Sequence, residues 1–328
     1  MPGLITHYIC AQACGQKIND EQLKNLLLSR RRIYNIGAQG PDVFFYYLPS
    51  VFRKSIYQMG ATMHKTKISD FFNSIITAID KIDSARAKSS SIAYLCGYIT
   101  HYALDSHTHP YIYYKSGFKT DGDGKRKIAH SVNHRNFETN IDVLMLDIVS
   151  SEKPSDKKIW EFVNARYAEA MCVSELISGV LMDAYGFKLS KKQVYNAFRS
   201  MRFINFILQS KGGRKRSVME FIENITVKEH VVTSLIHGES DGYDYLNLKN
   251  GEWFYPWENK TSFNRAFTDM FDDAVDEAVV MMEKTYDYFR GNVSKNETLD
   301  VIGNRSMATG MDSNIPLEFK FHEALMEN

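Results

Sequence analysis

The histidines of this chain are concentrated in its first part. Ten histidines occur in 328 residues, and those before residue 135 are His7, His64, His101, His107, His109, His130 and His134. Imidazole nitrogens and carboxylate oxygens are common ligands of Zn²⁺, and a site with three or four protein ligands leaves a position for water. This distribution indicates metal chemistry in about the first 140 residues.

Two of these histidines are followed by a carboxylate four residues later. In GYITHYALDSHTHP the pair is His101 and Asp105, and in NHRNFETNID it is His134 and Glu138. On a helix, side chains four residues apart emerge from the same face about one turn apart, so each pair can reach one ion. One such pair alone is more often a surface ion pair or a capping contact. The hypothesis of a metal site therefore depends on finding two.

The other candidates each have an ordinary explanation when taken alone. His7 lies beside Tyr8 and Ile9 and has the surroundings of a core histidine. Asp42, in the sequence Gly-Pro-Asp, suits a turn residue that bonds its own backbone. His64 has no distinguishing neighbours. Only the order and spacing of the whole set make these residues ligand candidates.

That order resembles the ligand pattern of the zinc-dependent phospholipase C family, which includes secreted clostridial and bacillary enzymes. The matching residues are His7, Asp42, His64, His101, Asp105, His109, His134 and Glu138. They lie in the motifs THY, GPD, HYALD followed by HP, and HRNFE. The motifs cover about the first 140 residues, and the helical character continues to about residue 290.

The resemblance implies an all-α, multi-helix fold of the phospholipase C and nuclease type around a cluster of two to three zinc ions. One ion would be held by Asp42, His64, His101 and Asp105. A second would be held by His109, His134 and Glu138. Asp105 would bridge to a third ion, together with His7 and the amino group of the chain. Metal-activated water would then attack the phosphorus, with Asp42 as a candidate general base or as a ligand only.

The start of the chain departs from the family pattern. The mature enzymes of the family begin with a tryptophan whose amino group and carbonyl bind the third zinc. This sequence begins with Met1, Pro2 and Gly3 and has no tryptophan before Trp160. Pro2, after removal of the methionine, or Met1 itself would have to supply the amine. The C-terminal half keeps a helical pattern without the membrane-docking β-sandwich of some toxins of the family, so cytolytic activity is not expected.

Helices must position these ligands. Apolar residues recur at three- and four-residue spacing, and only seven prolines interrupt them. The pattern predicts helices near residues 20–31, 70–83, 88–105, 132–150, 156–186, 190–210 and 263–290, and Pro110 is expected to stop the helix that carries His101. Clusters of glycine, proline and charge predict loops at 37–42, 119–127 and 211–216. Residues 1–290 are predicted to form a single helical catalytic domain, and residues 291–328 a polar, flexible tail.

Composition limits the cellular locations and the binding partners that are expected for the protein. Forty basic and thirty-nine acidic residues leave a formal net charge of +1, so no overall field steers nucleic acid or an anionic bilayer to the protein. The first residues lack the pattern of a secretory signal, and no apolar run approaches the roughly 18 residues that a membrane span needs. The four cysteines are widely spaced. A cytoplasmic protein with reduced thiols is therefore expected.

The sequence favours a phosphodiesterase that hydrolyses a phospholipid headgroup, such as that of phosphatidylcholine. Two alternatives stay open. One is a single-strand nuclease or nucleotidase on the same fold, for which the near-zero net charge is unfavourable. The other is a non-catalytic, metal-stabilised binding module. A small soluble phosphodiester or phosphomonoester also stays open as the substrate, and transient contact with a membrane surface is compatible with a lipid substrate. The sequence does not predict the oligomeric state.

Overall fold

The predicted all-α fold is confirmed. The computed structural model describes residues 3–48, 53–118, 126–209, 214–226, 232–238 and 240–323. Within these ranges the only sheet is an antiparallel pair of two short strands, β1 (Trp253–Phe254) and β2 (Ser262–Phe263). The terminal amine expected to bind a third zinc lies outside the described residues, as do residues 119–125 and 211–213 of the expected loops. The prediction of a loop was wrong for residues 126–127 and 214–216, which belong to helices.

The α-helices run along the whole chain, and shorter 3₁₀ helices connect some of them. The α-helices are α1 (Leu4–Lys17), α2 (Glu21–Ser29), α3 (Arg31–Gly37), α4 (Arg53–Met63), α5 (Ile68–Asp80), α6 (Ala85–Ser116), α7 (Arg126–Ser150), α8 (Tyr167–Tyr185), α9 (Lys191–Leu208), α10 (Arg214–Thr226), α11 (Phe267–Phe289) and α12 (Lys295–Ile302). The 3₁₀ helices are η1 (Gly40–Tyr46), η3 (Pro154–Asp156), η4 (Ile159–Glu161) and η6 (Thr233–Leu235).

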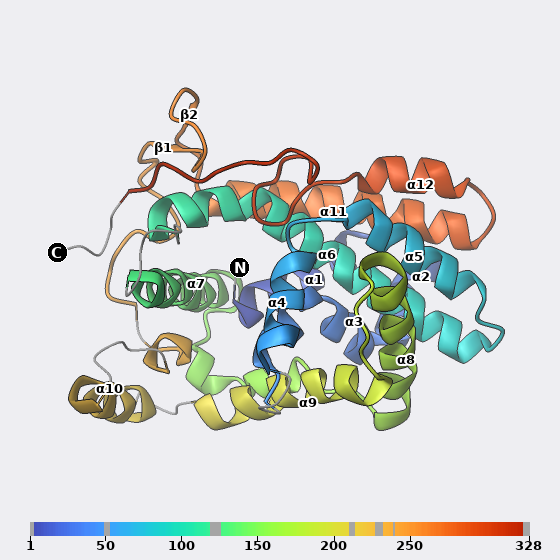
Figure 1. Cartoon of the computed structure of the whole chain (residues 1–328), viewed down its shortest axis with the longest axis horizontal. Helices are drawn as coiled ribbons and strands as arrows, with labels where there is room; N and C mark the ends of the chain where they lie inside the picture. The colour runs from blue at the N-terminus through green and yellow to red at the C-terminus, as the bar shows by residue number, and fades with distance from the viewer. Residues whose placement is uncertain are drawn as a thin grey trace.

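The long helix α6 forms the centre of the molecule (Figure 1). Its N-terminus is capped by Ser84, whose side chain accepts a hydrogen bond from the backbone N–H of Ala87. Every residue from Ser90 to Ser106 is buried, because helices α1, α3, α5, α7, α8 and α11 pack against α6. A helix that is buried on all sides can carry ionisable groups only if those groups have partners.

The prediction that Pro110 ends this helix was wrong, since α6 continues to Ser116. Proline has no N–H, so the carbonyl of Ser106 loses its usual partner within the helix. The chain near Gly310 lies against that carbonyl. Gly310 has a φ of +67°, and a Cβ atom there would lie 2.3 Å from the oxygen of Ser106. Packing by the C-terminal part of the chain therefore accommodates a proline that would normally break a helix.

A second difference concerns the helix expected over residues 156–186. The structure has the two short turns η3 and η4 in the first part of this range, and α8 begins only at Tyr167. The chain turns at Arg166, whose ψ of 139° is extended. Before this turn, Phe162 stacks on Tyr8 of α1 with ring centroids 3.8 Å apart, so tertiary packing determines the local conformation.

The segment after α11 also contributes to the core. Helix α12 packs against α11, and Met307 beyond it is fully buried. The hairpin of β1 and β2 lies beyond the C-terminal end of α6, where Trp253 packs edge-on against Tyr111 at 5.5 Å. No helix in the described part of the chain has the length and apolar character needed to span a membrane.

Helices α3 and α6 approach each other most closely at a glycine, and this contact positions η1, which follows α3. A Cβ atom on Gly97 would lie 2.1 Å from the carbonyl oxygen of Tyr34. A side chain there would force α3 away from α6, and overpacking of this kind typically costs about 1–3 kcal/mol. The separation between η1 and α6 thus depends on the absence of a side chain at Gly97.

We expect Gly97→Ala to lower the free energy of unfolding by about 1–3 kcal/mol, measured by urea denaturation. Gly179→Ala in α8 is the matched control, because a Cβ atom there meets nothing within 4 Å. The control should stabilise the protein by up to about 1 kcal/mol through helix propensity. Equal effects of the two substitutions would contradict a tight contact between α3 and α6.

Candidate metal centre

All eight ligand candidates lie in three adjoining groups of histidine and acidic side chains. Within each group the ligand atoms lie within 4.8 Å of one another. The groups are His7, His101 and Asp105; Asp42, His64 and His101; and His109, His134 and Glu138. Helices α1, α6 and α7, the 3₁₀ helix η1 and the turn directly after α4, where His64 lies, contribute these residues. Segments far apart in the sequence thus converge on one place.

Asp105 lies at the centre of this arrangement. Its carboxylate oxygens lie 3.1 Å from Nε2 of His101, 3.3 Å from Nε2 of His7 and 3.7 Å from Nε2 of His64. The side chain is fully buried. Burial alone would raise the pKa of Asp105, but the neighbouring imidazoles of His101 and His109 outweigh it and hold this pKa well below its usual range. The central carboxyl group is therefore ionised.

Several buried polar atoms around Asp105 have no hydrogen-bond partner among the described residues. They are both ring nitrogens of His7, Nε2 of His101 and His109, and both carboxylate oxygens of Asp105. Some of these atoms lie close to one another, but their relative orientation does not meet the geometry of a hydrogen bond. Each buried polar atom left without a partner costs roughly 1–3 kcal/mol, so this number in one place needs compensation. Divalent cations would satisfy the carboxylate oxygens of Asp105 and one ring nitrogen of each histidine, and this donor set of imidazole and carboxylate fits Zn²⁺.

Backbone carbonyls orient three of the imidazoles. Nδ1 of His64 donates to the carbonyl of Gly60 at 2.7 Å, and Nδ1 of His101 donates to that of Ala38 at 3.3 Å. Nδ1 of His109 donates to the carbonyl of Met307. A carbonyl only accepts, so Nδ1 carries the proton and Nε2 keeps a lone pair in each neutral ring. Hydrogen bonds of this kind fix the tautomer of metal-binding histidines.

The pKa shifts of two histidines favour the same neutral form. Burial lowers the pKa of His109 well below its usual value, even though Asp105 opposes the shift. Burial likewise lowers the pKa of His134 well below its usual value. Nε2 of His134 lies 2.8 Å from Oε1 of Glu138, and its Nδ1 lies 3.0 Å from Oγ of Ser116. A neutral imidazole is the form that binds a metal ion.

Asp142, which was missed in the sequence, fixes the helix that carries His7. Its buried carboxylate accepts hydrogen bonds from the backbone N–H of Ile5 at 3.1 Å, and from the backbone N–H and the hydroxyl of Thr6 at 2.8 and 2.6 Å. Nε2 of His237 lies 2.9 Å from the same carboxylate. Asp142 thus caps the first turn of α1, where a negative charge is also favoured by the helix dipole. It follows Glu138 by four residues on α7, a spacing visible in the sequence.

The remaining histidines and cysteines in this region have other contacts. His107 points to Glu277, with 2.7 Å between Nε2 and Oε2. His130 faces His322 with ring centroids 6.1 Å apart. The thiols of Cys10 and Cys14 donate to the backbone carbonyls of Thr100 and Val275. None of these two histidines and two cysteines belongs to the three groups around Asp105.

Comparison with known proteins relates the chain to one protein family. Residues 5–180 match the family model described as zinc dependent phospholipase C. The matched range spans more than half of the chain and includes every member of the three groups. No curated protein and no solved structure matches the chain.

We expect Asp142→Ala to lower the free energy of unfolding by roughly 2–4 kcal/mol, because buried donors of α1 lose a charged acceptor. Chemical denaturation of the purified variant measures this change. Asp147→Ala, an exposed position on the same helix, should alter the free energy by no more than about 0.5 kcal/mol. A loss for Asp142→Ala no larger than that of the control would show that the cap is not needed.

Proposed function

Because the chain belongs to the zinc-dependent phospholipase C family, we propose that it hydrolyses the phosphodiester bond of a phospholipid headgroup of the phosphatidylcholine type. The proposal includes two to three zinc ions bound by the cluster around Asp105. The observation that supports it most is the set of buried, unpartnered ligand atoms of His7, His101, Asp105 and His109. Without a bound ion, keeping these atoms together in the interior would only destabilise the fold.

The proposed ligand sets follow the three groups. Asp42, His64 and His101 would hold one ion together with Asp105, whose Oδ2 lies 3.7 and 3.1 Å from Nε2 of His64 and His101. His109, His134 and Glu138 would hold a second. Asp105 and His7 reach a third. Zinc in such a site supplies Lewis acidity toward the phosphoryl oxygens and lowers the pKa of water to about 7.

Asp42 is the proposed general base. It lies on η1, its side chain is 9% exposed, and its Oδ1 lies 3.1 Å from Nε2 of His64. It is the most exposed member of its group, since the side chains of His64 and His101 are 5% and 0% exposed. A carboxylate at the edge of the cluster can take a proton from the attacking water and still remain in contact with an ion.

Arg135 is the proposed binder of the substrate phosphate. It follows His134 on α7, and burial lowers its pKa. Its Nε donates to Oγ of Ser234 at 3.3 Å, and no carboxylate of the described residues lies within 4.0 Å of its guanidinium. A guanidinium without an acidic partner can form charge-assisted hydrogen bonds to phosphate oxygens.

Aromatic side chains beside the cluster suit the headgroup. Phe45 packs against His64 and against Tyr57, with ring centroids 5.5 and 4.7 Å apart. Tyr57 is 46% exposed, so this pair extends from the buried cluster to the surface. The face of an aromatic ring attracts a quaternary ammonium group such as choline. A cytoplasmic location is part of the proposal and agrees with four cysteines that form no disulfide.

The proposal is tested by elemental analysis of tag-free protein supplied with zinc, alongside hydrolysis of a soluble chromogenic phosphocholine ester. We expect two to three zinc ions per chain in the wild type and fewer in the double variant His101→Ala with Glu138→Ala, together with loss of hydrolysis. His107→Ala is the matched control, because His107 lies on the same helix but contacts Glu277. The control should keep its zinc and its activity.

No zinc in the wild type would exclude the metal mechanism. Zinc binding combined with hydrolysis of single-stranded DNA, and no hydrolysis of the phosphocholine ester, would replace the phospholipase by the nuclease. Zinc binding without hydrolysis of either substrate would favour the binding module.

We expect Asp42→Asn to lower turnover of the same ester by at least roughly 100-fold, because an amide cannot accept the proton. Asp70→Asn, an exposed aspartate in the first turn of α5, serves as the control and should leave turnover unchanged. Full turnover in Asp42→Asn would remove Asp42 from the role of base. Zinc content, measured for both variants, reports separately on its role as a ligand.

A further inference from the structure

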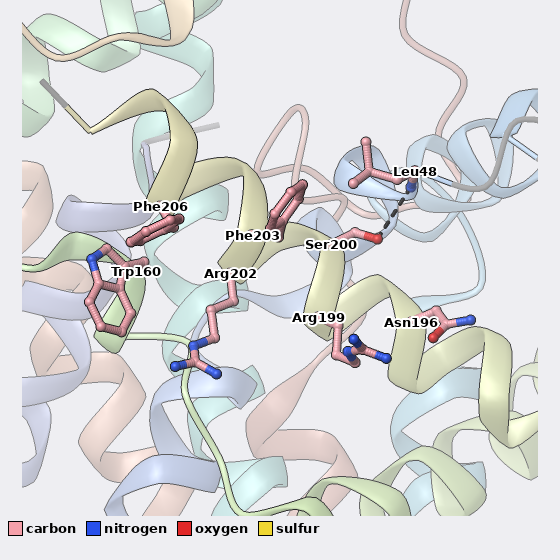
Figure 2. Close-up of a pocket in the computed structure, with 8 residues that line it drawn as sticks. All are labelled: Leu48, Trp160, Asn196, Arg199, Ser200, Arg202, Phe203 and Phe206. Atoms are coloured by element: carbon pink, nitrogen blue, oxygen red, sulfur yellow. Dashed lines mark hydrogen bonds between the residues drawn. The ribbon is translucent and has the colours of Figure 1, made fainter.

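An open groove of about 770 Å³ lies on the outer side of α9 (Figure 2). Trp160 and Phe206 lie side by side at one end of it, and Leu48 lies at the other. Phe203 lies between them on α9, and Arg199 and Arg202 extend from the same helix. The groove therefore combines aromatic rings with two guanidinium groups.

Helix α9 exposes a stripe of apolar side chains of the kind that helices usually bury. Val194, Ala197, Phe198 and Met201 face the core. On the opposite side the exposed residues are Arg199, Arg202, Phe203, Phe206 and Ile207. The last three are 52%, 56% and 48% exposed. Apolar residues at this three- and four-residue spacing normally mark a face that contacts something.

Helix α10 exposes further apolar residues. Nζ of Lys215 donates to the carbonyl of Ile207 at 2.9 Å and so joins the start of α10 to the end of α9. On α10 the exposed apolar residues are Val218, Phe221 and Ile222, at 59%, 66% and 45%. Figure 1 shows both helices along the lower edge of the molecule. We call the exposed residues of these two helices the α9–α10 surface.

The charge on α9 has one sign, whereas α10 also carries the exposed Glu220. The charged residues of α9 are Lys191, Lys192, Arg199 and Arg202, all basic. The guanidinium of Arg202 lies over the ring of Trp160 at 5.3 Å from the centroid. Neither Arg199 nor Arg202 has a carboxylate within 4.0 Å among the described residues, whereas Lys191 pairs with Glu175 at 3.3 Å. Arginines without acidic partners beside exposed aromatic rings complement an anionic lipid surface.

The α9–α10 surface adjoins the candidate metal centre. The backbone N–H of Leu48 donates to Oγ of Ser200 at 3.3 Å, which attaches the chain after η1 to α9. Helix η1 carries Asp42. A lipid bilayer in contact with Leu48 and Phe203 would thus meet the chain only a few residues from the cluster.

We propose that the α9–α10 surface docks the protein onto the surface of an anionic lipid bilayer. Phe203, Phe206 and Phe221 enter the boundary between headgroups and acyl chains, while Arg199 and Arg202 contact lipid phosphates. The proposal goes beyond hydrolysis and rests on the proposed function only in that docking would deliver a phospholipid to the metal centre. Docking itself needs no turnover.

Binding of the whole chain to vesicles tests the proposal. Sedimentation with vesicles of phosphatidylcholine alone, and of phosphatidylcholine with an equal part of phosphatidylglycerol, should show binding to the anionic vesicles that weakens as salt is raised. The double variant Phe203→Ser with Phe206→Ser should bind roughly tenfold more weakly or worse, because apolar area no longer enters the bilayer. The charge-reversal variant Arg199→Glu with Arg202→Glu should lose the preference for anionic vesicles by a factor on the order of ten.

The matched controls carry substitutions of the same type on other faces of the protein. Leu28→Ser with Val280→Ser removes side chains that are 65% and 57% exposed on α2 and α11, and Lys249→Glu with Lys260→Glu reverses two exposed charges. Both controls should bind vesicles as the wild type does. Hydrolysis of the soluble phosphocholine ester should be unchanged in all of these variants, which verifies folding and separates docking from catalysis.

Three outcomes would overturn the proposal. The phenylalanine variant could bind vesicles as tightly as the wild type. The wild type could bind a single-stranded oligonucleotide through Arg199 and Arg202 and bind no vesicles, which would assign the groove to nucleic acid. The wild type could also form a dimer that the phenylalanine variant disrupts, again without binding vesicles. Vesicle binding without hydrolysis of any ester would instead reject the proposed function and leave the docking surface in place.

Discussion

The ionised carboxylate of Asp105, enclosed by imidazoles in the interior of the protein, is the constraint on which the rest of the structure depends. Its side chain is 0% exposed and lies within 3.7 Å of ring nitrogens of His7, His64 and His101. A buried charge is costly unless it is paired, and neither carboxylate oxygen of Asp105 has a hydrogen-bond partner among the described residues. Bound metal ions would supply the missing partners of this carboxylate, so the stability of the fold and the proposed chemistry would depend on the same ions.

The fold supplies the cluster from both ends of the chain. Asp142 caps α1 and so holds His7 against α6, and the close crossing at Gly97 brings η1 toward the same helix. From the other end, Met307 accepts the hydrogen bond that orients His109. Residues 5–180 match the family model, yet the orientation of His109 depends on a residue beyond that range. The metal centre is therefore a property of the whole folded chain.

The sequence correctly predicted the features that depend on the local spacing of residues along a helix. The all-α fold followed from apolar spacing, and the four-residue offsets of His101 with Asp105 and of His134 with Glu138 do place each pair on one helix face, at 3.1 and 2.8 Å. The features that the sequence did not predict depend on tertiary contacts. Pro110 stays within α6, where the chain near Gly310 packs on the buried carbonyl of Ser106 that the proline leaves without a helical N–H partner. Nothing in the sequence around Pro110 signals this contact. Asp142 and Met307 bond to residues more than 130 positions away, so sequence spacing alone could not assign their partners.

The central claim is that the cluster around Asp105 binds zinc, and X-ray data collected on either side of the zinc absorption edge test it most directly. The account predicts anomalous peaks for zinc among the side chains of His101, Asp105 and His64, and among those of His109, His134 and Glu138. It also predicts that both peaks disappear above the edge when the protein is stripped with a chelator. Crystals grown with zinc that show no anomalous density at Asp105 would contradict the account.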